Sequence, residues 1–284
     1  MNAAPRLSFV QSTSSEVRNQ MQYDAETSVR KIGNSDYEGQ VDGHWNIGDN
    51  PNGGYLVSIA INAIANELPH PDPVSVTTHY LRPGTAGAPC QVSVDVIRKG
   101  RTLSSAKATL SQDGKEKLVV MAAFADLNET VGVDTELTLT APAIAPIGDC
   151  VPRTGSAQGV ALPLASRVNT LLDPEFAVPG KSAVAEMAGW ITFTDERDPD
   201  PRSLILFTDA FPPSPLSKLG AIGWVPTLEL TVHILSKPSP GPVQAYFKTD
   251  SLKQGRMIET GSLWDATGQL VATSRQLGLV MRQG

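Results

Sequence analysis

The chain has 284 residues, of which 40% are hydrophobic and 18% are charged, and its formal net charge is −6. This length suits two domains of ordinary size, and the apolar content is high enough for packed cores and too high for a disordered chain. The negative charge argues against a general nucleic-acid or membrane-surface binder. No apolar run reaches the roughly 20 residues that a membrane-spanning helix needs.

The amino-terminal segment, residues 1–25, contains several serines and lacks the apolar stretch of a secretory signal. We expect it to be an extension outside the folded units. The two cysteines, Cys90 and Cys150, are too few for a disulfide framework and lack metal-ligand spacing, so both are expected to be structural. Free cysteines fit a reducing compartment, and these features together predict a cytoplasmic protein.

Residues 26–128 are predicted to form the first folded unit. It opens with a pair of strands in "SVRKIGNSDYEGQVDGHW" and continues with a helix in "NGGYLVSIAINAIANEL". The helix is expected because apolar residues recur at the spacing of one helical face: Leu56, Ile59, Ala60, Ala63 and Ile64. Antiparallel strands follow, separated by Pro/Gly, Gly-Arg and Asp-Gly turns. The helix is expected to cover the apolar face of this sheet.

Residues 129–160 are rich in Thr, Ala, Pro and Gly, and we interpret them as a crossover linker with room for a short edge strand. The second unit, residues 161–284, has a shorter and proline-rich helix candidate in "DAFPPSPLSKLGAIGW". From Thr227 to Ile234 polar and apolar residues alternate, which predicts a strand with one apolar and one polar face.

The two halves are predicted to be copies of one structural unit. His79 and His233 are 154 residues apart, and Gly114 and Gly268 have the same separation. Between these positions both halves run through strands and turns in the same order. Turn residues that recur at a fixed separation of this length indicate a duplicated structural unit. We interpret the two histidines as corresponding residues on the polar face of the sheet rather than as catalysts.

A helix packed on an antiparallel sheet, duplicated in one chain, resembles the double hotdog fold of the α+β class. The motifs resemble those of the acyl-CoA thioesterase II-like family over about Ser28 to Arg282: "NPNGGYL", "SVTTHYLRP", "RKGRTLSSAKATLSQDGK", "LFTDAFPP", "VPTLELTVHI" and "ATSRQLGLVMR". The resemblance implies an enzyme of lipid metabolism that hydrolyses an acyl thioester to the free acid and CoA. It also implies an apolar tunnel for the acyl chain between the units.

The resemblance further implies three catalytic residues. In that family an Asp at the start of the second unit's helix, a Thr on the following strand and a Gln on the last strand hold the water that attacks the thioester. The matching positions are Asp209, Thr227 and Gln276. Structural roles compete with this interpretation, because Asp209 suits a helix N-cap and Thr227 suits any strand.

Thioester hydrolysis also needs hydrogen-bond donors for the oxyanion that forms at the carbonyl. Free backbone amides at a helix N-terminus can supply them, and glycine lets a ligand approach the backbone closely. Gly53, Gly54 and Tyr55 begin the helix of the first unit. We therefore expect them to bind substrate, with the amides of Gly54 and Tyr55 receiving the oxyanion.

The repeat predicts one site per chain. Subtracting 154 from Thr227 and Gln276 gives Pro73 and Ala122, so the first unit lacks these polar groups. If they served only the fold, both copies would need them equally.

Other chemistries lack support in the sequence. There is no G-x-S-x-G motif, no phosphate-binding or dinucleotide-binding loop and no zinc-ligand spacing, so we expect no metal and no cofactor. Three prolines interrupt the second helix candidate, at 212, 213 and 215. They leave open a non-hydrolytic acyl-thioester-binding protein, or a tailoring enzyme for acyl transfer, dehydration or cyclisation.

The expected partner is acyl-CoA or another acyl thioester, with no nucleic acid and no membrane. Arg82 and other basic residues in turns are candidates for contact with the phosphates of CoA, or are ordinary solvated charges. A duplicated chain already contains the pairing that single hotdog domains reach by dimerising. Both a monomer and a homodimer through an exposed sheet edge are compatible with the sequence.

Overall fold

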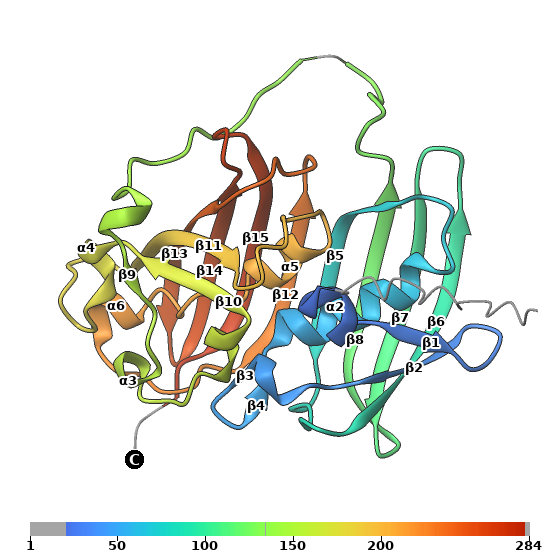
Figure 1. Cartoon of the computed structure of the whole chain (residues 1–284), viewed down its shortest axis with the longest axis horizontal. Helices are drawn as coiled ribbons and strands as arrows, with labels where there is room; N and C mark the ends of the chain where they lie inside the picture. Colours follow the sequence, from blue (N-terminus) through green and yellow to red (C-terminus); the bar gives the residue numbers. More distant parts are fainter. Residues whose placement is uncertain (1–20, 134, 282–284) are drawn as a thin grey trace, which may run out of the picture.

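The computed structural model describes residues 21–133 and 135–281, so residues 1–20 of the predicted extension lie outside the described residues. For residues 21–25 the prediction of an extension is wrong, because a helix begins at Gln22 and Tyr23 is buried in the core. In this part of the chain one antiparallel sheet has the strand order β1-β2-β6-β7-β8-β5-β12-β15-β14-β13-β11-β10-β9. Figure 1 shows the two halves side by side, joined by a long connection that passes over one end of the sheet. This is the α+β double hotdog arrangement expected from the sequence.

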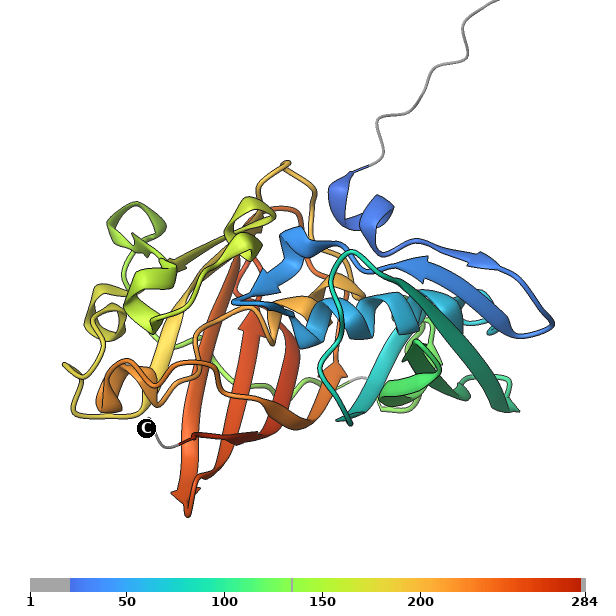
Figure 2. The same ribbon diagram turned by 90° about the horizontal axis from the view of Figure 1, so that it is seen from below.

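The first half carries one long helix and a continuous meander of strands. Its elements are α1 (Gln22–Glu26), β1 (Val29–Lys31), β2 (Asp36–Gln40), η1 (Gly43–Trp45), β3 (Asn46–Ile47), β4 (Asn50–Pro51), α2 (Gly53–Ala65), β5 (Asp72–Tyr80), β6 (Pro89–Lys99), β7 (Ser104–Gln112) and β8 (Lys115–Ala125). The predicted strand pair, helix and meander are therefore all present. Figure 2 shows α2 running along the inside of the curved sheet.

The second half repeats the meander but has only short helices. Its elements are η2 (Ile147–Asp149), β9 (Val151–Pro152), α3 (Gly155–Gln158), η3 (Pro163–Ser166), β10 (Val168–Leu172), α4 (Pro174–Ala177), β11 (Glu186–Phe193), α5 (Ser203–Phe207), α6 (Leu216–Leu219), β12 (Thr227–Ile234), β13 (Val243–Lys253), β14 (Arg256–Trp264) and β15 (Leu270–Leu279). The strand expected at Thr227–Ile234 has these bounds, and its alternate residues Leu230, Val232 and Ile234 are buried.

The duplication is visible as a symmetric strand order about the central pair β5–β12. Reading outward from this pair, β8, β7 and β6 on one side correspond to β15, β14 and β13 on the other. Thr77 lies opposite Thr231, their hydroxyl oxygens are 3.0 Å apart, and the two residues are separated by 154 positions. The separation of 154 residues found in the sequence therefore relates equivalent residues of β5 and β12, the two strands at the centre of the sheet.

The helices of the two halves depart from this symmetry. The family pattern places Asp209 at the start of the second unit's helix, and this expectation is wrong. Asp209 follows α5, whose last residue is Phe207, and α6 begins only at Leu216. Pro212 and Pro213 lie in the gap, where their missing amides and fixed rings cannot continue a helix.

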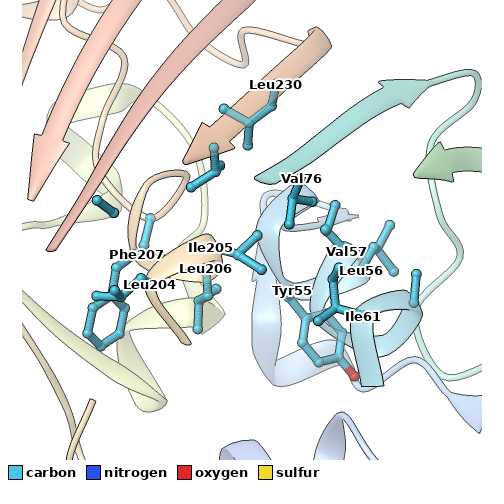
Figure 3. Close-up of a cluster of buried hydrophobic side chains, with 14 of the residues drawn as sticks. Tyr55, Leu56, Val57, Ile61, Val76, Leu204, Ile205, Leu206, Phe207 and Leu230 are labelled. Atoms are coloured by element: carbon cyan, nitrogen blue, oxygen red, sulfur yellow. The ribbon is translucent and has the colours of Figure 1, made fainter. Parts of the chain in front are cut away.

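The two helices pack against each other between the halves of the sheet. Figure 3 shows Ile205 of α5 pointing toward α2, beside Val57 and Leu56. These side chains are fully or almost fully buried. Gly54 permits the contact, because a Cβ at this position would lie 2.9 Å from the Leu206 Cα and 3.0 Å from the Ile205 carbonyl oxygen. The packing of α2 on α5 therefore requires glycine at position 54.

None of the helices in the described ranges is long and apolar enough to cross a membrane.

A Gly54→Ala substitution should separate α5 from α2, because the added methyl group meets backbone atoms that cannot rotate away. We expect a loss of about 1–3 kcal/mol of unfolding free energy. Calorimetry should show a fall of roughly 2–10 °C in melting temperature. Gly148→Ala is the matched control, since a Cβ there meets nothing within 4 Å. Equal melting temperatures for the two variants would contradict the close-packing argument.

Candidate functional site

Asp209 is attached to the start of α2 in the other half of the chain. Its Oδ2 accepts hydrogen bonds from the Gly54 amide at 2.8 Å and from Asn52 Nδ2 at 3.0 Å. Asn52 Nδ2 also donates to the Asp209 carbonyl oxygen at 2.7 Å. The unpaired amides of a helix N-terminus favour an anion, so α2 rather than α5 supplies the dipole that acts on this carboxylate.

Asn52 connects the helix cap to the carboxylate. Its Oδ1 accepts from the Tyr55 amide at 2.9 Å, which is the usual role of an asparagine N-cap. The amide nitrogen of the same side chain holds Asp209. One residue therefore fixes the start of α2 and the position of the carboxylate together.

The environment of Asp209 raises its pKa to about 6, and burial is the main cause. The Gly54 amide, the positive charge of Arg153, the Gly53 amide and the Asn52 side chain each act in the opposite direction. Desolvation disfavours the charged form, whereas hydrogen bonds and a nearby cation favour it. The result is a carboxylate that is mostly ionised at pH 7 and basic enough to take a proton.

Thr227 and Gln276 form a second pair on the sheet. Gln276 Nε2 donates to Thr227 Oγ1 at 2.6 Å. A bulge between Thr227 and Glu229 interrupts the pairing of β12 with β15, and Thr227 lies opposite Gly278 while Leu230 lies opposite Gln276. Gln276 therefore reaches its partner diagonally across the two strands.

Asn52 and Asp209 line the same pocket as the Thr227–Gln276 pair, and its volume is about 210 Å³. Gly53, Asp209, Thr227 and Gln276 all contribute to its wall. Leu81 and Trp224 at the wall are 46% and 41% exposed, which marks an open end, whereas Phe247 is only 2% exposed and marks the interior end. The structure thus brings the predicted Asp, Thr and Gln to a common cavity between the two halves.

Arg153 is a buried cation in this wall, and no sequence pattern had singled it out. It lies in the segment interpreted as linker, and its guanidinium donates to the Ala210 carbonyl and to Gln158 Oε1. Its Nε has no hydrogen-bond partner within the described residues. Burial lowers its pKa to about 10, and the charge of Asp209 opposes this effect. It therefore remains cationic at neutral pH beside the carboxylate.

Glu259 is a second buried carboxyl group in the wall, and it is 5% exposed. Its Oε2 accepts from the Ser214 amide at 2.7 Å. Burial raises its pKa to about 7, Ser214 lowers it, and the charge of Asp209 raises it further. The sequence carried a signal for this residue: Met257, Glu259, Gly261 and Leu263 alternate on the buried face of β14, where one acid interrupts an apolar series.

Tyr80 places a phenol next to Asp209. A Cβ added to Gly53 would lie 2.9 Å from both the Tyr80 hydroxyl oxygen and Asp209 Oδ2, so both groups flank this glycine. The hydroxyl is buried and has no hydrogen-bond partner in the ranges that the structure covers. Burial and the charge of Asp209 raise the pKa of Tyr80, so the phenol is neutral.

The expected oxyanion donors are not free. The Gly54 amide is bonded to Asp209 and the Tyr55 amide is bonded to Asn52. The Tyr55 side chain is fully buried, stacks on Trp45 with ring centroids 5.1 Å apart, and does not line the pocket. Only Gly53 of the three predicted residues reaches the pocket wall. The amides at the start of α2 are therefore occupied by the Asp209 carboxylate and the Asn52 cap. The sequence could not reveal this, because Asp209 is far away along the chain.

The two histidines and the group of possible metal ligands lie outside the pocket. His79 and His233 are exposed on the sheet. The described residues with metal-ligating atoms in proximity are Glu26, Asp42 and His44. Glu26 is already bonded through both oxygens to Arg167, at 2.6 and 2.7 Å, so it is poorly suited to a cation.

Two family models match the chain in tandem. The acyl-CoA thioesterase N-terminal domain matches residues 41–127, and the acyl-CoA thioesterase C-terminal domain matches residues 147–280. Together they cover most of the sequence, including both groups of polar residues in the pocket.

Solved structures and sequence relatives agree with these matches. A proposed thioesterase II from Thermobifida fusca is 30% identical, with a TM-score of 0.83 over 93% of this chain and 99% of that one. A hotdog protein of unknown function from Alicyclobacillus acidocaldarius is 21% identical, with a TM-score of 0.79 over 93% and 100% of the chains, and shows the shared fold. A functionally unassigned Mycobacterium tuberculosis protein is 25% identical over 87% of this chain and 91% of its own length. The chain therefore belongs to the acyl-CoA thioesterase II-like hotdog family.

Proposed function

We propose that this protein hydrolyses an acyl-CoA thioester to the free acid and CoA, with Asp209 as the general base. The observation that carries the proposal is that Asp209, with its raised pKa, shares one pocket with the bonded pair Thr227–Gln276. This hydrolysis needs a base whose pKa lies near neutral pH, together with groups that orient the attacking water, and Thr227 and Gln276 are two uncharged groups of that kind.

The hydrogen bonds support a distinct role for each side chain. Asn52 and Gly54 both donate to Oδ2 of Asp209, and the Gly53 amide also stabilises the carboxylate; we assign Oδ1 as the atom that takes a proton from water. Gln276 donates to Thr227, so the Thr227 hydroxyl proton is left to donate to the water oxygen. Gln276 Oε1 is then an acceptor for the second water proton. These three contacts would leave one lone pair of the water directed at the thioester carbon.

The proposed reaction has two steps. The water oxygen forms a bond to the carbonyl carbon as one water proton moves to Asp209. The tetrahedral intermediate then collapses, the carbon–sulfur bond breaks, and the proton on Asp209 passes to the CoA sulfur. Because the Gly54 and Tyr55 amides are occupied, we assign the oxyanion instead to the second Nε2 proton of Gln276.

The open end of the pocket would receive the CoA portion. Arg82 lines this end and is exposed, and its Nη1 donates to the Glu116 carbonyl at 3.0 Å. The other guanidinium protons are available to phosphate oxygens. The acyl group would then pass Asp209 toward Phe247.

Asp209→Asn should lower kcat for acyl-CoA hydrolysis by at least about 100-fold, because the amide cannot take a proton. Asparagine keeps an acceptor for the Gly54 amide, so binding should be retained. Release of free CoA, followed with a thiol reagent, measures the rate. Glu175→Gln, at an exposed carboxylate outside the pocket, is the control. Equal kcat values would remove Asp209 from the chemistry, and tight binding by wild type without turnover would favour the non-hydrolytic alternative.

The rate of hydrolysis should rise with pH and then become constant. Asp209 must be ionised to act as a base, and its pKa is about 6, so kcat/KM should rise between pH 5 and pH 7 and then level off. Below the pKa each pH unit should lower the rate about tenfold. Any residual activity of Asp209→Asn should lack this rise. A wild-type profile that is flat from pH 5 to pH 8 would argue against Asp209 as the base.

Thr227→Val and Gln276→Leu should be strongly coupled, because the two side chains share one hydrogen bond, and Gln276→Leu should be the more severe because it also removes the oxyanion donor. Each removes the same bonded pair, so each should lower kcat by about 10- to 100-fold and the double variant should be little worse than Gln276→Leu alone. A double-mutant cycle on kcat measures this coupling. Fully additive losses would show that the two side chains act independently.

A further inference from the structure

Glu259 lies beside two aromatic side chains in the interior part of the pocket wall. Phe211 and Phe247 line this end, and their rings are 5.2 Å apart. Glu259 lies opposite Gln276 on the neighbouring strand, so it is beyond the proposed reacting centre as seen from the exposed Leu81 and Trp224. A plain hydrocarbon chain requires no acid at this depth.

Glu259 keeps unused hydrogen-bonding capacity. The Ser214 amide donates to Oε2, the Ser214 side chain is a further hydrogen-bond partner of the carboxyl group, and the same hydroxyl lies 2.7 Å from Thr249 Oγ1. A carboxyl group has about four acceptor sites when ionised, and one donor when protonated, so a single neighbouring residue does not saturate it. Water can meet this need in the free protein. A hydrocarbon that displaced the water would leave the buried group without a partner, which is costly.

The charge around Glu259 restricts what can replace that water. Arg153 and Asp209 are buried groups of opposite charge that favour each other's ionised form, and the charge of Asp209 also acts on Glu259. An anionic acyl terminus would meet two carboxyl groups and would be repelled. A cationic terminus would meet the charge of Arg153 in the same wall, so the matching ligand group is uncharged.

A hydroxyl is the neutral group that suits Glu259 in either protonation state. It accepts a hydrogen bond from the protonated acid and donates one to the carboxylate. A ketone oxygen can only accept, so it suits the protonated form alone. With a pKa of about 7, both forms of Glu259 are populated at neutral pH.

From these contacts we propose that the acyl group taken by this pocket is short and carries a hydroxyl, which Glu259 binds at the interior end. The pocket volume of about 210 Å³ supports the short chain, since pockets for drug-sized ligands are roughly 300–1,000 Å³. The inference rests on the proposed thioesterase function for its substrate class. It adds Glu259 as a specificity-determining residue.

The test compares acyl-CoA substrates of equal chain length with and without a hydroxyl. Butyryl-CoA is paired with its 3-hydroxy and 4-hydroxy derivatives, and valeryl-CoA with its 5-hydroxy derivative. Wild type should favour at least one hydroxylated member of a pair by about tenfold or more in kcat/KM, because sites built to bind a hydroxyl discriminate strongly against its absence. Succinyl-CoA, with an anionic terminus, should be a poor substrate.

Two substitutions of Glu259 test whether this residue causes the preference for hydroxylated substrates. Glu259→Leu should reverse this preference. It should lower kcat/KM for the hydroxylated substrate at least about tenfold, whereas kcat/KM for the unsubstituted chain should rise or stay unchanged. Glu259→Gln keeps a donor and an acceptor and should retain most of the preference. Glu175→Leu, at an exposed acid, should leave it unchanged. Melting temperatures show whether each variant is folded.

A binding measurement separates this inference from the hydrolysis itself. CoA thioethers, with a methylene in place of the carbonyl, cannot be hydrolysed and can be compared by calorimetry with and without a terminal hydroxyl. Wild type and Asp209→Asn should both bind the hydroxylated thioether about tenfold more tightly, and Glu259→Leu should not. If this pattern appears without turnover of any thioester, the hydrolytic proposal fails and the role of Glu259 stands.

The opposite results overturn the inference. Hydrolysis that is equal or faster with plain chains in every pair, or a hydroxyl preference that persists in folded Glu259→Leu, excludes Glu259 as the hydroxyl-binding group. Failure of wild type to bind either thioether excludes both proposals.

Discussion

The contact between the Asp209 carboxylate and the N-terminus of α2 is the constraint on which the rest of the site depends. It joins a loop of the second half to the helix of the first half through the Gly54 amide and Asn52. The short helix α5 must approach α2 closely for the loop to reach, and Gly54 leaves room for its backbone. Because α2 provides the hydrogen-bond donors, the carboxylate remains a usable base in spite of its burial.

The same contact has no symmetric counterpart among the described residues, although the chain is duplicated. The sheets of the two halves follow the same strand order on either side of β5–β12, and both have a bulge at the corresponding place, Pro73/Ser75 in β5 and Thr227/Glu229 in β12. The helices differ, because α2 has 13 residues and α5 has five. The long helix offers a capped N-terminus, and the interrupted one places an acid against it. Asymmetry in the helices, on a symmetric sheet, produces the pocket.

The pocket combines buried charge with an apolar wall. Arg153 offsets the charge of Asp209, and Glu259 adds an acid whose pKa is about 7. Unpaired charges in an apolar environment are destabilising, so such groups persist where they have partners or a task. In the proposed function Asp209 acts on water and Glu259 on the acyl group, and Gln276 lies opposite Glu259 on the neighbouring strand.

The sequence by itself determined the duplicated hotdog fold, helix α2 and strand β12, because period, turn residues and alternation are local properties of the chain. It also pointed to Asp209, Thr227 and Gln276 through their motifs. Only the tertiary structure decided what surrounds them. Arg153 has no local pattern, and the saturation of the Gly54 and Tyr55 amides depends on Asp209 and Asn52 meeting α2 in space. The pKa of Asp209 likewise follows from burial and from partners up to 157 residues away, which no local pattern encodes.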